Sequence, residues 1–290
     1  LDKLEAEVLL ISDKARFITG ILEETIDLRR KKKDVVCAML LNMNFAVINN
    51  DHEFKHLVRM PMDSVTEENV ESLLKQKEMR EKGQSPCQIH NNCSGKHAGF
   101  LSVSRHLNAG PEYTDPDHPV QLMVMDVFQE LTQNKVDGIT IDGCSAPNPA
   151  IPLYSLAKAM SWFATAHNRD DQLSKAALKI RTAMVNYPEL VAGKLRACTN
   201  LMKACEKKAI LKTGAEGVFV AILPELEKGI ALKIFDGGTR ASECAIASLL
   251  IQLGVLNPNH PTALAYTHAP ILNWRKIETG MMKASNSFKV

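Results

Sequence analysis

Residues 90–99 read His-Asn-Asn-Cys-Ser-Gly-Lys-His-Ala-Gly and hold more reactive chemistry than any other stretch of the chain. These ten residues carry two imidazoles, two amides, a thiol, a hydroxyl and an ammonium, and almost none of them could serve a hydrophobic core. The apolar spacing of residues 100–107 is compatible with a helix. We therefore predict a loop that runs into a helix N-terminus, with glycines that let the backbone bend closely around a ligand. Such a loop suits a metal ligand set, an anion cradle or a nucleophile with its base, and the alternative is a polar turn around a buried thiol.

A second stretch, residues 139–152, reads Ile-Thr-Ile-Asp-Gly-Cys-Ser-Ala-Pro-Asn-Pro-Ala-Ile-Pro. Its β-branched start predicts a short strand that ends at Asp142, and a proline-rich loop is expected to follow. The end of a strand can present a carboxylate and a thiol, here Asp142 and Cys144, into a cleft.

These two stretches and the segment Asp-Pro-Asp-His-Pro-Val-Gln at residues 115–121, in this order, resemble the type II L-asparaginases of the thermolabile Rhizobium kind. The resemblance is specific over residues 85–254, moderate to the C-terminus and poor before residue 85. It implies the fold of serine β-lactamases and glutaminases, hydrolysis of L-asparagine to L-aspartate and ammonia, and a homodimer.

The resemblance also implies a zinc site. In these asparaginases the cysteine and lysine of Cys-Ser-Gly-Lys and the cysteine of Asp-Gly-Cys bind one zinc ion together with water, which carries over to Cys93, Lys96 and Cys144. Two thiolates suit zinc, and Lys96 could bind only as the neutral amine, a state that an adjacent dication favours. We expect Asp142 to support the ligands or the bound water, and His90 and His97 are candidates for a supporting or a structural role. The alternative is two buried cysteines and a lysine that caps a loop.

The catalytic groups of the resembling family are a serine, a lysine three residues later that takes its proton, and a second serine paired with a lysine on a late strand. The best placement puts Lys14 on the first lysine and Lys233 on the late one. Ile11 then occupies the position of the nucleophile, Ser12 comes one residue late, and Met39 replaces the second serine. An unactivated or missing hydroxyl cannot form the acyl-enzyme, so we expect weak hydrolysis of asparagine or none.

Two other functions stay open. Ile11 and Met39 favour a non-catalytic paralogue that binds zinc or an amino acid. The letters Lys212-Thr213-Gly214 match a β-lactamase motif and would suit another serine acyltransferase of the β-lactamase or glutaminase kind. We interpret them as a common turn before a strand.

Hydrophobic periodicity and capping signals predict the remaining elements. Helices are expected at residues 64–79, 119–131, 153–166, 173–186 and 241–253, with one more that starts at residue 188 and takes in Cys198 and Cys205 as core thiols; a hairpin is expected from strands at 217–223 and 229–235. This order predicts an α+β fold, in which an antiparallel sheet carries a helical subdomain. We expect residues 1–84 to form a divergent N-terminal part of the sheet domain and residues 85–290 the zinc-site and helical region returning to the sheet, in one catalytic unit.

Composition restricts the remaining function classes. The chain has 290 residues, of which 45% are hydrophobic and 23% charged, as in ordinary globular proteins. A net charge of +2 without a basic patch predicts no nucleic-acid or anionic membrane partner, and no run reaches the ~18 apolar residues of a membrane span. Seven irregularly spaced cysteines do not form a secreted disulfide framework, which favours a reducing cytoplasm. The small-molecule substrate, L-asparagine, is what the family resemblance implies.

Overall fold

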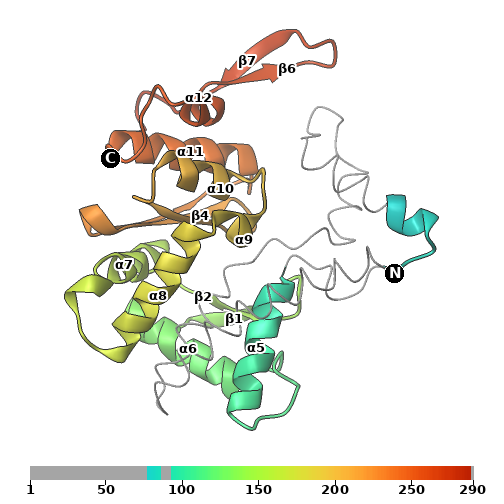
Figure 1. The fold of residues 1–290 in the computed structure, drawn as a ribbon, viewed down its shortest axis with the longest axis vertical. Coiled ribbons are helices and arrows are strands. Elements are labelled where there is room, and N and C mark those ends of the chain that lie inside the picture. The colour runs from blue at the N-terminus through green and yellow to red at the C-terminus, as the bar shows by residue number, and fades with distance from the viewer. Residues whose placement is uncertain (1–76, 86–92, 289–290) are drawn as a thin grey trace.

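The computed structural model describes residues 77–85 and 93–288 and confirms the predicted α+β architecture. Within that part, helices surround a three-stranded sheet, and two further two-stranded sheets lie apart from it (Figure 1). Ile11, Ser12, Lys14 and Met39 lie outside the described residues, as does most of the helix predicted at 64–79. The described end of that helix is present, because residues 77–81 are helical and Gly83 follows with φ 64°.

The central sheet is antiparallel and has the strand order β3-β4-β5. Strand β3 spans Ile210–Thr213, β4 spans Val218–Leu223 and β5 spans Lys228–Lys233. The predicted hairpin is confirmed, and a short 3-10 helix, η4 (Pro224–Leu226), joins its strands. All residues of β4 from Phe219 to Leu223 are buried, so both faces of this strand are covered.

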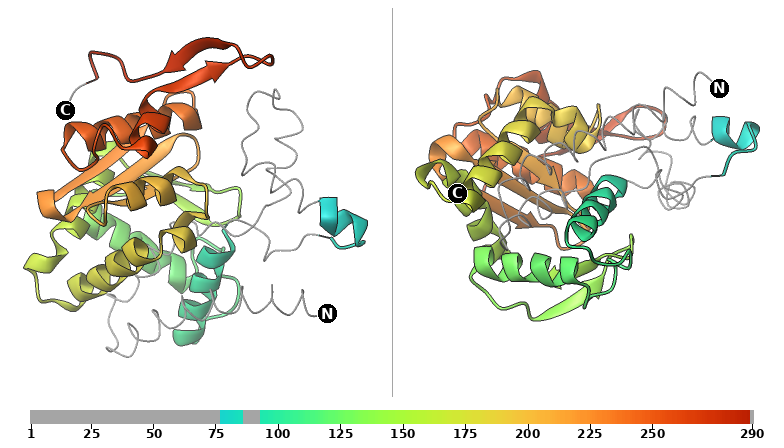
Figure 2. Two further views of the ribbon diagram at one scale, coloured as in Figure 1. Left: turned by 45° about the horizontal axis from the view of Figure 1, so that its top comes forward. Right: turned by 60° about the horizontal axis from the view of Figure 1, so that its bottom comes forward.

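Two helices cover this sheet. Helix α7 (Leu153–Ala164) packs on β4 and β5, and α11 (Thr239–Gln252) packs on β4 from the other side (Figures 1 and 2). The backbone of α7 comes unusually close to the sheet at Gly229, where an added Cβ would lie 2.2 Å from the backbone nitrogen of Ser161 and 2.3 Å from the carbonyl oxygen of Ala157. Only glycine leaves room for this helix to rest on β5.

The predicted helices at 119–131, 153–166, 173–186 and 241–253 are confirmed. They correspond to α6 (Pro119–Thr132), α7, α8 (Gln172–Asn186) and α11, and a 3-10 helix, η3 (Ala166–Asn168), follows α7. The single helix predicted from residue 188 is wrong: the segment forms α9 (Pro188–Ala192) and α10 (Ala197–Ala204). Gly193, with φ 91°, breaks the helix between them. Cys198 and Cys205 are buried in the core as predicted.

Two loop predictions are also wrong. The proline-rich segment forms strand β2 (Pro147–Ala150), which pairs antiparallel with β1 (Gly138–Ile141). Prolines are tolerated there because each strand of a two-stranded sheet is an edge strand. Lys212 and Thr213 belong to β3 rather than to a turn, and the turn starts only at Gly214.

The C-terminal part continues with α12 (Pro261–Thr267) and a hairpin of β6 (Ala269–Leu272) and β7 (Glu278–Met282). These strands pair with each other rather than with β3–β5. Among the helices that the structure describes, none has the length and apolar character that a membrane crossing requires.

Candidate functional site

The N-terminus of helix α5 forms one side of the candidate site. Helix α5 spans Ser94–His106, six residues earlier than the predicted start, so Lys96 and His97 lie in its first turn rather than in a loop. Cys93 is the N-cap residue, and the first turn contains no acidic side chain. Because the first N–H groups of a helix lack helical partners and carry the positive end of the helix dipole, this position favours an anionic group.

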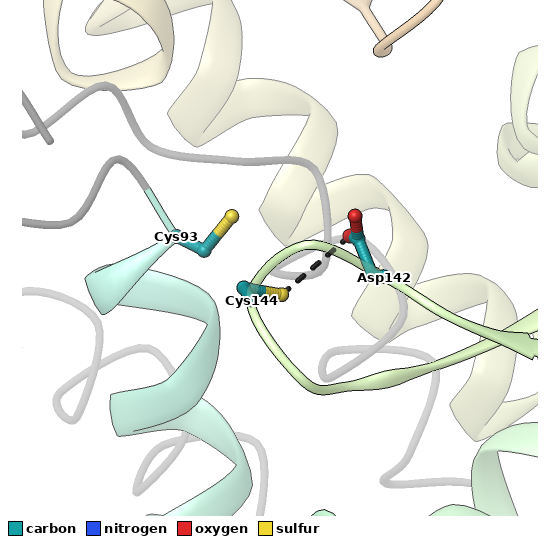
Figure 3. A group of neighbouring side chains, drawn as sticks. All are labelled: Cys93, Asp142 and Cys144. Atoms are coloured by element: carbon teal, nitrogen blue, oxygen red, sulfur yellow. Dashed lines mark hydrogen bonds between the residues drawn. The ribbon is translucent and has the colours of Figure 1, made fainter. Parts of the chain in front are cut away.

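The turn between β1 and β2 forms the other side. The backbone nitrogen of Asp142 donates to the carbonyl of Ala146 at 2.9 Å, and that of Ser145 donates to the carbonyl of Asp142 at 2.8 Å. The backbone nitrogen of Gly143 also donates to Asp142 Oδ1 at 2.7 Å, which fixes the carboxylate and leaves Oδ2 available. The turn thereby places Asp142 and Cys144 beside the start of α5, with the sulfur of Cys144 pointing toward the carboxylate of Asp142 (Figure 3).

Four side chains meet between these two elements, and we call Cys93, Lys96, Asp142 and Cys144 the Cys93 cluster. Lys96 Nζ lies 3.0 Å from Cys144 Sγ and 3.3 Å from Asp142 Oδ2. The two sulfurs and a carboxylate oxygen of Asp142 all lie within 4.8 Å of one another. Cys93 is 6% exposed and Lys96 3% exposed, whereas Asp142 and Cys144 are half-buried. The structure therefore brings together the three predicted zinc ligands and Asp142. In the sequence, Cys93 and Lys96 at the start of α5 lie 46 to 51 positions before Asp142 and Cys144 in the turn.

The cluster separates its charges. The pKa of Cys144 is lowered well below its usual range, mainly by a hydrogen bond with Cys93. Burial alone would raise this pKa, but hydrogen bonds from His97 and Lys96 lower it further. The hydrogen bond between Cys93 and Cys144, together with burial, raises the pKa of Cys93. Burial alone would lower the pKa of Lys96, but the hydrogen bond to Cys144 and the negative charges of the cluster raise it. Without a metal, the arrangement is thus a thiol, a thiolate and an ammonium.

An aromatic group supports the cluster from behind. His97 Nδ1 and the hydroxyl of Tyr113 share a hydrogen bond of 2.8 Å, and the imidazole packs edge-on against Tyr113 and Phe100. The imidazole helps to lower the pKa of Cys144, yet its buried Nε2 makes no hydrogen bond within the part of the chain that the structure describes. The sequence offered His97, alongside His90, as a supporting or structural candidate. It missed Tyr113, because no local pattern connects that residue to residues 90–99.

The donor set of the cluster fits a zinc ion. Tetrahedral zinc with Zn–S bonds of ~2.3 Å holds two sulfurs about 3.8 Å apart, and the sulfurs of Cys93 and Cys144 lie within 4.8 Å of each other. Cys93 and Lys96 must lose their protons to bind, as is usual for such ligands, whereas Cys144 is already a thiolate. Asp142 offers an alternative third donor. In residues 77–85 and 93–288, the only group of three acidic, histidine or cysteine residues close enough to bind one metal ion is Cys93, Asp142 and Cys144.

A second lysine lies behind the cluster. Lys212 on β3 is buried, and its ammonium donates to the carbonyl of Thr213. Burial lowers the pKa of Lys212 to about 8, and the charges of Cys198, Cys93 and Lys96 also act on it. The sequence did not indicate this buried cation, because the Lys-Thr-Gly letters were interpreted as a turn.

Lys233, the predicted late-strand lysine, is not brought into contact with the cluster. It is the last residue of β5, which is an edge strand among the strands that the structure describes. Its side chain is exposed, and its ammonium donates to the carbonyl of Ile234. The catalytic roles of Lys233, Lys14 and Ser12 stay predictions.

Comparison with known proteins gives one family. The family model described as L-asparaginase II matches residues 49–284. A search of the curated proteins gives no match. The matched region contains all four residues of the Cys93 cluster and Lys233, and it begins after Ser12, Lys14 and Met39.

Proposed function

The chain belongs to the L-asparaginase II family, and from this premise we propose that it is an amidohydrolase that converts L-asparagine to L-aspartate and ammonia. The observation that carries this proposal is the family match, which extends over more than half of the chain. The convergence of Cys93, Lys96 and Cys144 supports it, because these residues come from two of the stretches that carry the resemblance.

We further propose that Cys93, Lys96 and Cys144 hold one zinc ion. The fit of their donor atoms to a tetrahedral shell supports this proposal. A bound zinc ion would supply Lewis-acid polarisation of an oxygen atom of the substrate or of water. The residues of the chain contribute the rest: the α5 N-terminus and His97 stabilise negative charge on Cys144, and the half-exposed Asp142 can hold a proton at Oδ2.

For the acyl-transfer groups we propose the placement with Lys14, Ser12 and Lys233, and with it a weak or absent turnover of asparagine. Ile11 and Met39 supply no nucleophile, and losing a serine that works with its base lowers turnover by a factor on the order of 10⁶. The same two residues favour the second candidate function, a non-catalytic paralogue that binds zinc or an amino acid. The third candidate, another serine acyltransferase, loses support because Lys212 lies buried inside β3.

The deciding experiment measures ammonia release from L-asparagine and L-glutamine by the purified chain, and hydrolysis of a chromogenic β-lactam. We expect slow, saturable ammonia release from L-asparagine alone. Saturable binding of L-asparagine in calorimetry without ammonia release would instead support the binding paralogue. Preferred hydrolysis of the β-lactam would support the acyltransferase and contradict the amidohydrolase.

We also propose a homodimer, on the family resemblance alone. Light scattering on the eluting size-exclusion peak should give twice the monomer mass of 32.1 kDa. A monomer mass at all concentrations contradicts this.

A further inference from the structure

The cluster contains two thiols that face each other across two elements. Cys93 is fixed at the start of α5, and Cys144 lies in the β1–β2 turn, with the two sulfurs no more than 4.8 Å apart (Figure 3). The other described cysteines, Cys198, Cys205 and Cys244, are buried at 4% exposure or less. Of the five described cysteines, Cys144 alone is half-buried and can meet a small molecule from solvent.

We propose that Cys93 and Cys144 form an oxidation site, at which a hydroperoxide closes a disulfide between α5 and the β1–β2 turn. A disulfide has an S–S bond of about 2.05 Å, so the sulfurs must approach by less than about 3 Å from their separation of at most 4.8 Å. Within the described residues, no other element packs against the turn at Gly143, because an added Cβ there would meet no atom within 4 Å. The site needs neither zinc nor amide hydrolysis.

The exposure of the two thiols sets the order of the steps. The thiolate sulfur of Cys144 attacks hydrogen peroxide; an S–O bond forms, the O–O bond breaks, and the leaving hydroxide takes a proton from the solvent and departs as water. The buried sulfur of Cys93 then attacks the sulfur of the sulfenic acid; an S–S bond forms, the S–O bond breaks, and the second hydroxide leaves as water with the proton of Cys93. Two thiols are oxidised by two electrons and one peroxide is reduced to two waters.

Lys96 is placed to assist this reaction. Its ammonium lies 3.0 Å from Cys144 Sγ and is 3% exposed, so it can donate a hydrogen bond to an oxygen that is carried on this sulfur. The disulfide also removes both sulfurs as thiolate donors. Oxidation and metal binding therefore exclude each other at this site.

The test is mass-spectrometric mapping of the full chain in a Cys87→Ser background. This background is needed because Lys82 and Lys96 bound a tryptic fragment that contains both Cys87 and Cys93. The chain is treated with chelator and then with hydrogen peroxide, its remaining thiols are alkylated, and it is digested without reductant. We expect most chains to yield fragment 83–96 joined to fragment 136–158, and dithiothreitol to separate the two fragments.

Matched variants in the same background complete the test. A further Cys93→Ser or Cys144→Ser substitution should abolish the joined fragments, whereas Cys244→Ser should leave them. The mapping of the Cys87→Ser chain itself stands even if a cluster variant fails to fold. Alkylated Cys93 beside a sulfinic Cys144 would overturn the proposal. A disulfide from Cys144 to Cys37, or an oxygen-bridged link from Cys144 to Lys96, would also overturn the proposal.

Discussion

The ammonium nitrogen of Lys96 lies 3.0 Å from the sulfur of Cys144, across the gap between helix α5 and the β1–β2 turn. Two anionic groups balance this buried cation, because the carboxylate of Asp142 also lies 3.3 Å from the ammonium of Lys96. In the metal-free chain, Lys96 therefore occupies the electrostatic role of a cation that holds two anionic groups together. A zinc ion would take over that role and require the proton of Lys96 to leave.

Replacing Lys96 by methionine tests this role. Lys96→Met keeps an unbranched side chain that is one atom shorter but leaves Cys144 and Asp142 without their cation. We expect the free energy of unfolding to fall by about 3 kcal/mol, at the lower end for a broken buried pair because the Asp142 side chain is still 35% exposed. Urea denaturation in the presence of a chelator measures it. The control Lys175→Met breaks the surface pair with Asp170 and should change stability by less than about 1 kcal/mol. Equal effects of the two substitutions would contradict the role of Lys96.

Metal content tests the zinc proposal. Purified protein should contain about one zinc per chain, and Cys93→Ser or Cys144→Ser should remove it, while Cys244→Ser should not. Lys96→Met and Asp142→Asn distinguish the two possible third donors. We expect Lys96→Met to abolish binding and Asp142→Asn to weaken it by about 10- to 100-fold, as for a residue that supports the ligands. Elemental analysis and competition with a chromogenic chelator give the measurements; zinc-free wild-type protein would refute the site.

The sequence predicted those parts of the fold whose signals are local. Periodicity placed α6, α8 and α11 and the β4–β5 hairpin, and the resemblance joined Cys93, Lys96 and Cys144 into one site. It failed where tertiary contacts decide: strand β2 contains two prolines and forms only because β1 pairs with it. Likewise nothing near Tyr113 shows that its hydroxyl reaches His97, and the burial of Lys212 depends on what packs over β3.

A glycine substitution tests the packing of α7 on the sheet. In Gly229→Ala the added methyl group would lie 2.2 Å from the backbone of Ser161, so strand or helix must move. We expect a loss of about 3 kcal/mol or more in the free energy of unfolding, at the upper range for overpacking. Gly138→Ala in β1 is the matched control, because an added Cβ there meets no atom within 4 Å. Its effect should stay within about 1 kcal/mol. Similar denaturation midpoints for both variants would contradict the close approach.

The buried Lys212 predicts a pH dependence of stability. Burial lowers its pKa to about 8 in the folded chain, whereas the unfolded value is about 10.4. Between these pH values the unfolded chain binds more protons, so the contribution of Lys212 to the free energy of unfolding rises with pH by up to about 3 kcal/mol. Below both pKa values, the contribution of Lys212 to the free energy of unfolding is constant and unfavourable.

The buried thiols of Cys198 and Cys205 act in the opposite direction, because burial raises their pKa and the unfolded chain ionises first. We therefore measure the difference in the free energy of unfolding between wild type and Lys212→Met, by urea denaturation from about pH 7 to about pH 10.5. We expect this difference to move in favour of wild type as pH rises. A difference that stays constant over this pH range would mean that Lys212 binds its proton equally well in the folded and the unfolded chain.

Restoring two serines tests the placement of the catalytic groups. If Ile11 and Met39 occupy the positions of the two serines, the double substitution Ile11→Ser with Met39→Ser supplies both missing hydroxyls. A nucleophile that acts with its base is worth a factor on the order of 10⁶ in turnover, so even partial recovery should raise ammonia release from L-asparagine many-fold. The matched control moves both serines back by one residue, as Leu10→Ser with Ala38→Ser. A shift of one residue turns a side chain to the opposite face of a strand or by about 100° around a helix, so the control should gain nothing. Equal rates in the two double variants contradict the placement. Strong ammonia release by the unmodified chain that disappears on Ser12→Ala would instead assign the nucleophile to Ser12.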